Sequence, residues 1–163
     1  MLELYDYELS GNCYKIRLIL SFLNLDYKSK KIEFYPSEEH KSEVFLQINP
    51  LGQLPVISDG GLILRDAQAI LVYLASKYDK TNKWYNVNDP EMLGSVSQWL
   101  AFGDSITGSA SAARLHDTLF YNNFNIDKCR ETAHSQFRIL DEHLFFQEEL
   151  GCNWICKGEC PSI

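Results

Sequence analysis

Sequence patterns typical of β-strands occur only in the first half of the chain. This uneven distribution restricts the possible folds more than any other feature of the sequence. Four short segments are predicted to be strands: Leu2–Asp6, Tyr27–Ile32, Val56–Ser58 and Leu62–Leu64. Beyond residue 89 the apolar residues repeat only at helical spacing. The sequence therefore predicts an α/β domain that is followed by an all-α domain.

The first two predicted strands flank a helix. Asn12 is predicted to cap this helix, which runs to about Leu23. Its apolar face carries Ile16, Ile19, Leu20 and Leu23. Since a strand, a helix and a strand in succession form a right-handed unit, the two strands are expected to be parallel.

The next part of the chain is predicted to contain a short helix, a β-hairpin and a further helix. The segment "EEHKSEVFLQINP" is predicted to be a short helix that Asn49 and Pro50 stop. Two strands are then joined through Asp59-Gly60-Gly61, and Asp66 is predicted to cap the helix "AQAILVYLASKY". The resulting order, β-α-β-α-β-β-α, is the thioredoxin-like arrangement.

The remainder of the chain divides into a linker and a helical domain. Residues 1–79 form the first predicted domain, residues 80–89 a polar linker, and residues 90–163 the helical domain. One helix is expected from Pro90, which suits a first helical turn, to about Leu115. A second helix is expected to begin near Asp127.

Charge and cysteine content limit the cellular context and the partners. The net charge is −7, which argues against nucleic acids and anionic membrane surfaces as partners. No apolar run is long enough to span a membrane, and the N-terminus lacks the basic start of a signal peptide. The cysteines are Cys13, Cys129, Cys152, Cys156 and Cys160. Their odd number indicates reduced thiols in the cytoplasm, and the last three lack the spacing of a metal site, so no metal is expected.

A hydroxyl and a thiol lie three residues apart at the start of the first predicted helix, in "SGNC". A helix N-terminus has unpaired N–H groups and a partial positive charge, and it therefore favours an anion such as a thiolate. The spacing is that of a C-x-x-C motif whose first, attacking cysteine is replaced by Ser10. The residues alone leave open whether Ser10 stabilises a thiolate or only caps the helix. Cys13 is expected to be a small buried residue.

Three segments resemble the cytosolic glutathione transferases: "ELSGNCYKIRLIL", "NPLGQLPVISDGGLILRDAQAILVYLASKY" and "SQWLAFG". The first segment is most similar to the serine-type, theta-like bacterial branch, and the chain is shorter than a full member. The resemblance implies a transferase that joins the thiolate of glutathione to a small hydrophobic electrophile. It also implies a cytoplasmic homodimer, formed through the third and fourth helices, with glutathione as co-substrate and no other cofactor. Two alternatives remain, a glutathione-dependent disulfide reductase and a non-catalytic interaction module.

The resemblance also assigns roles to individual residues. Ser10 is the catalytic hydroxyl, and Pro55 is a cis proline that exposes the backbone of Leu54 to the cysteinyl part of glutathione. Asp66 accepts the γ-glutamyl ammonium. The glutathione-binding residues that it implies are Asn12, His40, Lys41, Gln53, Leu54, Val56, Asp66 and Ala67. Ala67 departs from the family, which usually has a serine there.

Further expectations concern the helical domain. The resemblance implies that the electrophile binds in a pocket built from residues such as Trp99, Phe102 and Ile106. It also implies that Asp104 contacts the glutathione bound by the partner subunit of a dimer. His40 and Lys41 are expected to reach the glycyl carboxylate, or else to lie on a solvated helix face. At the end of the chain, Ser162 lacks the second half of a capping box, which predicts a shortened and marginally stable helical domain.

Overall fold

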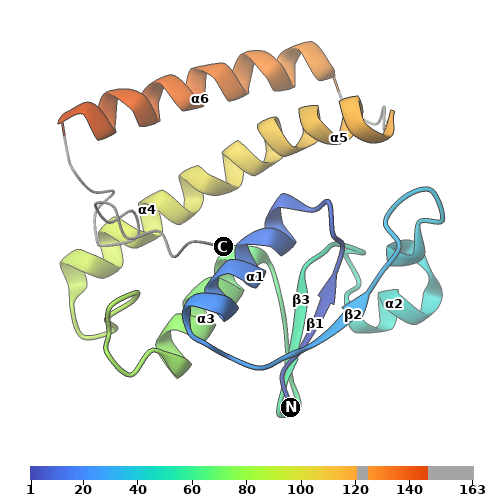
Figure 1. Ribbon diagram of the computed structural model, residues 1–163, viewed down its shortest axis with the longest axis horizontal. Helices are drawn as coiled ribbons and strands as arrows, with labels where there is room; N and C mark the ends of the chain where they lie inside the picture. Colours follow the sequence, from blue (N-terminus) through green and yellow to red (C-terminus); the bar gives the residue numbers. More distant parts are fainter. Residues whose placement is uncertain (121–124, 147–163) are drawn as a thin grey trace. The chain divides into compact units, whose positions relative to one another are not determined.

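The computed structural model describes residues 1–120 and 125–146 (Figure 1). The chain divides into two compact units, Met1–Tyr78 and a second unit that begins at Asp79. Each unit has its own architecture and is taken by itself below.

The first unit is built on a mixed four-stranded sheet. Its strands are β1 (Glu3–Asp6), β2 (Lys28–Lys31), β3 (Val56–Asp59) and β4 (Leu62–Arg65), in the order β2-β1-β3-β4. Strands β1 and β2 are parallel, whereas β3 is antiparallel to both β1 and β4. The predicted combination of a parallel pair and a hairpin is confirmed, and the fold is thioredoxin-like.

Helices cover both faces of this sheet. They are α1 (Gly11–Phe22), the short 3₁₀-helix η1 (Glu39–Lys41), α2 (Glu43–Ile48) and α3 (Ala67–Tyr78). Figure 1 shows α1 and α3 together on one side of the sheet, away from α2. Phe45 of α2 packs against Ile32 and Val56. Since neighbouring strand residues face opposite ways, the buried Ile57 faces the α1 and α3 side.

Two predicted helix boundaries are wrong. The N-cap of α1 is Ser10 and not Asn12, because Ser10 has extended backbone angles and its Oγ accepts the N–H of Cys13. The segment predicted as one helix before Pro50 is divided into η1 and α2. The division arises because Ser42 is extended and caps α2 by accepting the N–H of Phe45.

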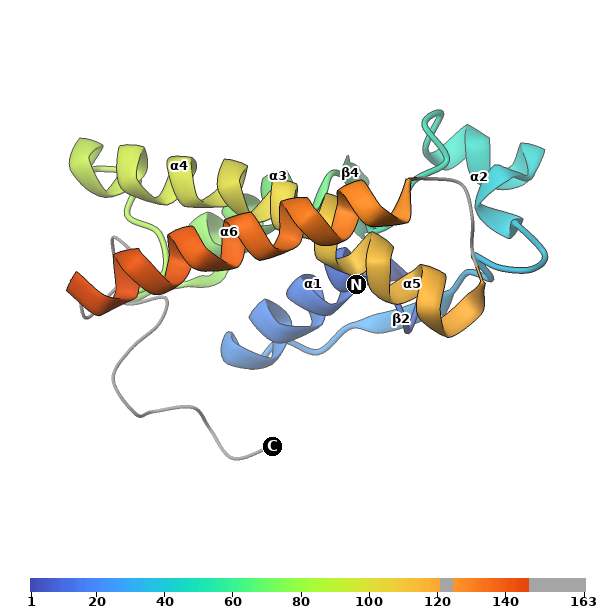
Figure 2. The same ribbon diagram turned by 90° about the horizontal axis from the view of Figure 1, so that it is seen from above.

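The described part of the second unit contains helices and no strand, as predicted. Asp89 caps α4 (Pro90–Ile106), which continues through the π-helical segment η2 (Thr107–Ser111) into α5 (Ala112–Leu119). Helix α6 (Ile126–Phe146) runs back beside them, as Figures 1 and 2 both show. The predicted helix from Pro90 to about Leu115 is therefore present, with a π-helical turn inside it. None of the described helices is long and apolar enough to cross a membrane.

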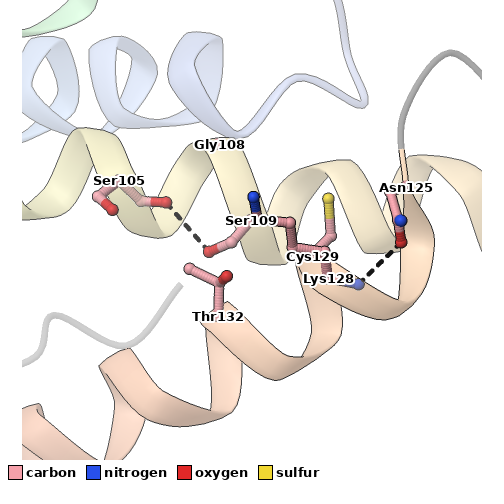
Figure 3. A pocket seen from close by; sticks show the side chains of 7 residues that line it. All are labelled: Ser105, Gly108, Ser109, Asn125, Lys128, Cys129 and Thr132. Atoms are coloured by element: carbon pink, nitrogen blue, oxygen red, sulfur yellow. Dashed lines mark hydrogen bonds between the residues drawn. The ribbon is translucent and has the colours of Figure 1, made fainter.

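A buried polar contact joins η2 to α6. The Oγ of Ser109 donates to Oε1 of Gln136 at 2.6 Å, and Nε2 of Gln136 donates to Oγ of Ser105. Beside this contact lies a hollow of about 230 Å³ (Figure 3). It is lined by Ser105, Gly108, Ser109, Asn125, Lys128, Cys129 and Thr132. The π-helical turn thus places a serine where it satisfies a buried amide of the facing helix.

Candidate functional site

The strand register brings three segments of the first unit to one end of its sheet. Tyr5 of β1 pairs with Val56 of β3, and Val56 pairs with Arg65 of β4. The segment that follows β1, the segment that precedes β3 and the segment that follows β4 therefore leave the sheet at the same end. These segments carry Ser10, Leu54–Pro55 and Asp66, three parts of the predicted site.

Ser10 lies at the N-terminus of α1 and is half-buried. Its Oγ accepts the backbone N–H of Cys13 at 3.2 Å, and its own N–H donates to the carbonyl of Tyr7 at 3.0 Å. A hydroxyl that accepts one hydrogen bond can still donate its proton to another group. Capping the helix and stabilising an anion are therefore compatible for this residue.

Cys13 is fully buried in the first turn of α1. Burial raises the pKa of its thiol to about 11, although the side chain of Ser10 and the N–H of Tyr7 act in the opposite direction. The thiol therefore stays protonated at neutral pH and is a poor nucleophile. This agrees with the predicted structural role of Cys13.

The peptide bond between Leu54 and Pro55 is cis, the isomer that the resemblance implies. The loop before it is shaped by buried Asn49, whose Nδ2 donates to the carbonyl of Gln53 at 2.8 Å. Gln53 is exposed and Leu54 half-buried, so both are accessible. The side chain of Val56 lies in the core, so only its backbone is available to a ligand.

His40 and Lys41 have different environments. His40 is only 3% exposed and stacks on Phe34, with ring centroids 4.2 Å apart. Burial lowers the pKa of this imidazole, and its Nδ1 has no hydrogen-bond partner among the described residues. The alternative of a solvated helix face is therefore wrong for His40. Lys41 is exposed, and its Nζ donates to the carbonyl of Leu51 at 3.3 Å.

Gly52 is a structural requirement of this site that the sequence reasoning missed. Its φ is +57°, and a Cβ at this position would lie 2.8 Å from the backbone oxygen of His40. The glycine therefore lets the loop before the cis proline pass directly over His40 and Lys41. Its place in "NPLGQ" gave no hint of this contact, which joins segments that are separate in sequence.

Asp66 and Ala67 form the N-terminus of α3. The Oδ1 of Asp66 accepts the N–H of Ala69 at 2.9 Å, so the predicted cap is confirmed. Asp66 is exposed, and its φ of 75° turns the chain from β4 into the helix. Ala67 is buried, so a serine there would bury its hydroxyl unless a ligand accepted or donated a hydrogen bond. In α1, the predicted Asn12 is half-buried and accepts Nζ of Lys15 at 3.0 Å.

An ion pair between the last residue of β1 and the second turn of α1 was also missed. Nη1 of Arg17 lies 2.5 Å from Oδ1 of Asp6, and Nη2 donates to the carbonyl of Glu8 at 3.0 Å. A hollow of about 640 Å³ adjoins this pair. It is lined by Asp6, Tyr7, Glu8, Tyr14, Arg17, Lys31, Ile32 and Glu33. No periodic pattern relates a strand end to the second turn of the next helix, so the sequence gave no signal for this contact.

Residues of the second unit pack among themselves. Trp99 makes edge-to-face contacts with Phe102 and His143, at centroid distances of 5.6 and 4.5 Å. Ile106 is half-buried, and Asp104 is exposed. Among the described residues, no cluster of His, Cys, Asp and Glu could hold a metal ion. Cys152, Cys156, Cys160 and Ser162 lie outside the described residues.

Known proteins resemble the chain in both sequence and fold. Residues 4–82 match the glutathione S-transferase N-terminal domain. Glutathione S-transferase theta-1 of Rattus norvegicus is 35% identical over 102 residues, which cover 63% of this chain and 42% of that protein. Theta-2 of Homo sapiens is 43% identical over 72 residues, which cover 44% of this chain and 29% of that protein. The chain therefore spans less than half the length of these two relatives.

Solved structures extend the likeness over nearly the whole chain. Glutathione transferase E6 of Drosophila melanogaster superposes with a TM-score of 0.82 at 24% identity, covering 94% of this chain and 70% of that one. The transferase URE2P6 of Phanerochaete chrysosporium, solved with oxidized glutathione, gives 0.81 at 25% identity and covers 93% and 71%. The fold of both units is thus the fold of these transferases.

Proposed function

Because residues 4–82 match the glutathione S-transferase N-terminal domain, we propose that this chain is a glutathione transferase of the serine-type, theta-like bacterial branch. The thiolate of glutathione attacks an electrophilic carbon, a sulfur–carbon bond forms, and the leaving group departs with its electron pair. The observation that carries the proposal is the convergence of Ser10, cis Pro55 and Asp66 at one end of the sheet.

In this proposal each part of glutathione is bound by a different segment. The Ser10 hydroxyl donates to the thiolate, and the backbone of Leu54 pairs with the cysteinyl residue in the manner of an added strand. The second carboxylate oxygen of Asp66, Oδ2, accepts the γ-glutamyl ammonium beside the N-terminus of α3. Buried His40 and exposed Lys41 lie toward the glycyl carboxylate. Asn12, Gln53, Val56 and Ala67 complete the proposed site.

One hydroxyl placed at a helix N-terminus is sufficient on energetic grounds. Lowering a thiol pKa by about two units requires roughly 2.7 kcal/mol of preferential stabilisation of the thiolate. A hydrogen bond to a charged acceptor supplies about 1.5–3 kcal/mol, and a helix N-terminus adds roughly 0.3–1 kcal/mol. Ser10 and the N-terminus of α1 together reach this sum without a general base.

The proposal also includes the partners of the chain. We expect a cytoplasmic homodimer that forms through α3 and α4, and a small hydrophobic electrophile as second substrate. Glutathione serves as co-substrate, with no other cofactor.

Three measurements on the full chain separate the proposed function from its alternatives. Conjugation is measured with a chromogenic electrophile, disulfide reduction with a mixed glutathione disulfide, and binding with immobilised glutathione. We expect conjugation to dominate, because Ser10 cannot form the mixed disulfide that reduction requires and Cys13 is buried. Reduction without conjugation, or retention on glutathione without either activity, would refute the transferase assignment.

A further inference from the structure

The loop that carries Ser10 is held in place by contacts of its backbone. Its residues run from Tyr7 to Ser10, between the end of β1 and the start of α1. The N–H of Tyr7 donates to Sγ of Cys13 at 3.5 Å, and the carbonyl of Tyr7 accepts the N–H of Ser10. These contacts fix the two ends of the loop, while the carbonyl of Glu8 in its middle is bound by Arg17 alone of the described residues.

Arg17 makes two hydrogen bonds through different nitrogens of its guanidinium. One nitrogen of its guanidinium lies 2.5 Å from the carboxylate of Asp6, the last residue of β1, and the other donates to Glu8. The side chain of Asp6 is 11% exposed and that of Arg17 is 25% exposed, so the pair is shielded from water on most sides. A planar guanidinium can bond to both acceptors at once, whereas an ammonium group has no such fork.

We propose, on the basis of the transferase function above, that Arg17 is a positioning residue for catalysis. It fixes the loop that presents the Ser10 hydroxyl, and it neutralises the carboxylate of Asp6, the residue that precedes this loop. Arg17 acts through Ser10 and Asp6 and does not touch glutathione in this proposal.

The charge of Asp6 already reaches the start of α1 in this structure. Asp6 contributes to the raised pKa of Cys13, although burial is the larger cause. A carboxylate that destabilises one sulfur anion at this helix N-terminus is expected to destabilise another, that of glutathione. Losing the Arg17 guanidinium would leave this carboxylate buried and uncompensated.

The test is the pH dependence of kcat/KM for the electrophile, at saturating glutathione, with the full chain. This profile reports the pKa of the bound thiol. For Arg17→Gln we expect that pKa to rise by about one unit, which lowers kcat/KM about tenfold on the acidic side. Arg17→Lys keeps the charge but loses the fork, so its pKa should lie between those of Arg17→Gln and the parent chain. The matched control is Arg130→Gln, which breaks the exposed Arg130–Asp117 pair of 2.8 Å and should leave the profile unchanged.

The outcomes distinguish this inference from the proposed function. If Ser10→Ala and the parent chain have the same profile, the assignment of Ser10 fails, and the role of Arg17 fails with it. If Ser10→Ala raises the pKa while Arg17→Gln and Arg17→Lys leave it unchanged, only the inference about Arg17 is overturned. If Arg17→Gln does not fold, an unchanged profile for Arg17→Lys overturns the two-point contact, and a raised pKa supports it.

Discussion

Ser10 and Asp66 each cap a helix and are each also proposed to bind part of glutathione. Ser10 caps α1 through Cys13 and is proposed to hold a thiolate, while Asp66 caps α3 and is proposed to hold an ammonium. The capping hydrogen bond of Ser10 uses its Oγ as an acceptor, so the hydroxyl proton can still be donated to a ligand. The capping hydrogen bond of Asp66 uses Oδ1, so Oδ2 can accept a hydrogen bond from a ligand. Helix caps are therefore well suited to a binding site, because their polar groups are already oriented before a ligand binds.

Ala67→Ser tests the departure from the family pattern. We expect glutathione to bind up to about tenfold more tightly, equivalent to about 1.4 kcal/mol, because a hydroxyl is added beside its γ-glutamyl carboxylate. Since Ala67 is buried, the free variant should melt lower than the parent and recover when glutathione is added. Calorimetric titration measures the affinity. Equal or weaker binding would mean that the carboxylate is bound elsewhere.

Gly52→Ala tests the close passage of the loop over His40. A Cβ would lie 2.8 Å from the His40 carbonyl oxygen in a conformation that already disfavours side chains, so we expect destabilisation beyond the strain of a positive φ alone. Gly60→Ala is the matched control, because its φ of +58° is nearly the same and its Cβ would meet open space. Urea denaturation compares the two variants. Equal losses of unfolding free energy would show that the contact with His40 is unimportant.

Elements of the first unit are tied together at the end of the sheet opposite the site. Asp59, the last residue of β3, accepts three hydrogen bonds on one oxygen. They come from Nζ of Lys77 at 2.7 Å, the hydroxyl of Tyr78 at 2.6 Å and the hydroxyl of Tyr73 at 2.8 Å. All three donors lie on α3, so this cluster joins the hairpin to the C-terminal half of that helix.

The Asp59 cluster predicts an acid-dependent loss of stability. Lys77, with smaller contributions from Tyr78 and Tyr73, holds the pKa of Asp59 at about 2. A group with a lowered pKa in the folded state stabilises fully above its unfolded pKa, near 4, and this contribution disappears as the pH falls towards about 2. Asp59→Asn should therefore lower the unfolding free energy at pH 7. Its difference from the parent should shrink in the acidic range, as measured by denaturant melts at several pH values. A pH-independent difference would contradict the assignment.

Elements were more predictable from the sequence than the contacts between them. Periodicity and turn residues predicted the order of strands and helices, because these signals are local to each segment. The missed features depend on residues that meet only in the folded chain: the split caused by Ser42, the passage of Gly52 over His40, and the bond from Arg17 to Asp6. The resemblance supplied the site residues, and the strand register explains why three of their segments share one end of the sheet.

The two units of the chain differ in the number of hydrophobic residues that they bury. All but two of the buried hydrophobic residues of the described chain belong to the first unit, and the two exceptions are Val96 and Ala133. Helix α6 also exposes apolar side chains, among them Phe137, Ile139 and Leu144. The second unit is therefore expected to be the less stable of the two.

Hydrogen exchange tests this difference directly. Amides of α4 and α6 should exchange faster than those of β1, β3 and α3, because fewer buried apolar contacts oppose their local opening. Mass spectrometry of peptic fragments gives the rates for each element. Equal protection in both units would show that the helices of the second unit are stabilised by more than the described core.

The proposed stabilisation of bound glutathione's thiolate by the Ser10 hydroxyl can be measured through the ultraviolet absorbance of that thiolate. The absorbance is titrated against pH for the parent chain, Ser10→Ala and Cys13→Ser, each saturated with glutathione. We expect the pKa of the bound thiol in the parent chain to lie about two units below that of a free thiol. Ser10→Ala should raise this pKa by at least one unit, while Cys13→Ser should have little effect. A thiolate that forms equally well in Ser10→Ala, or that is lost only in Cys13→Ser, would show that Ser10 does not stabilise it.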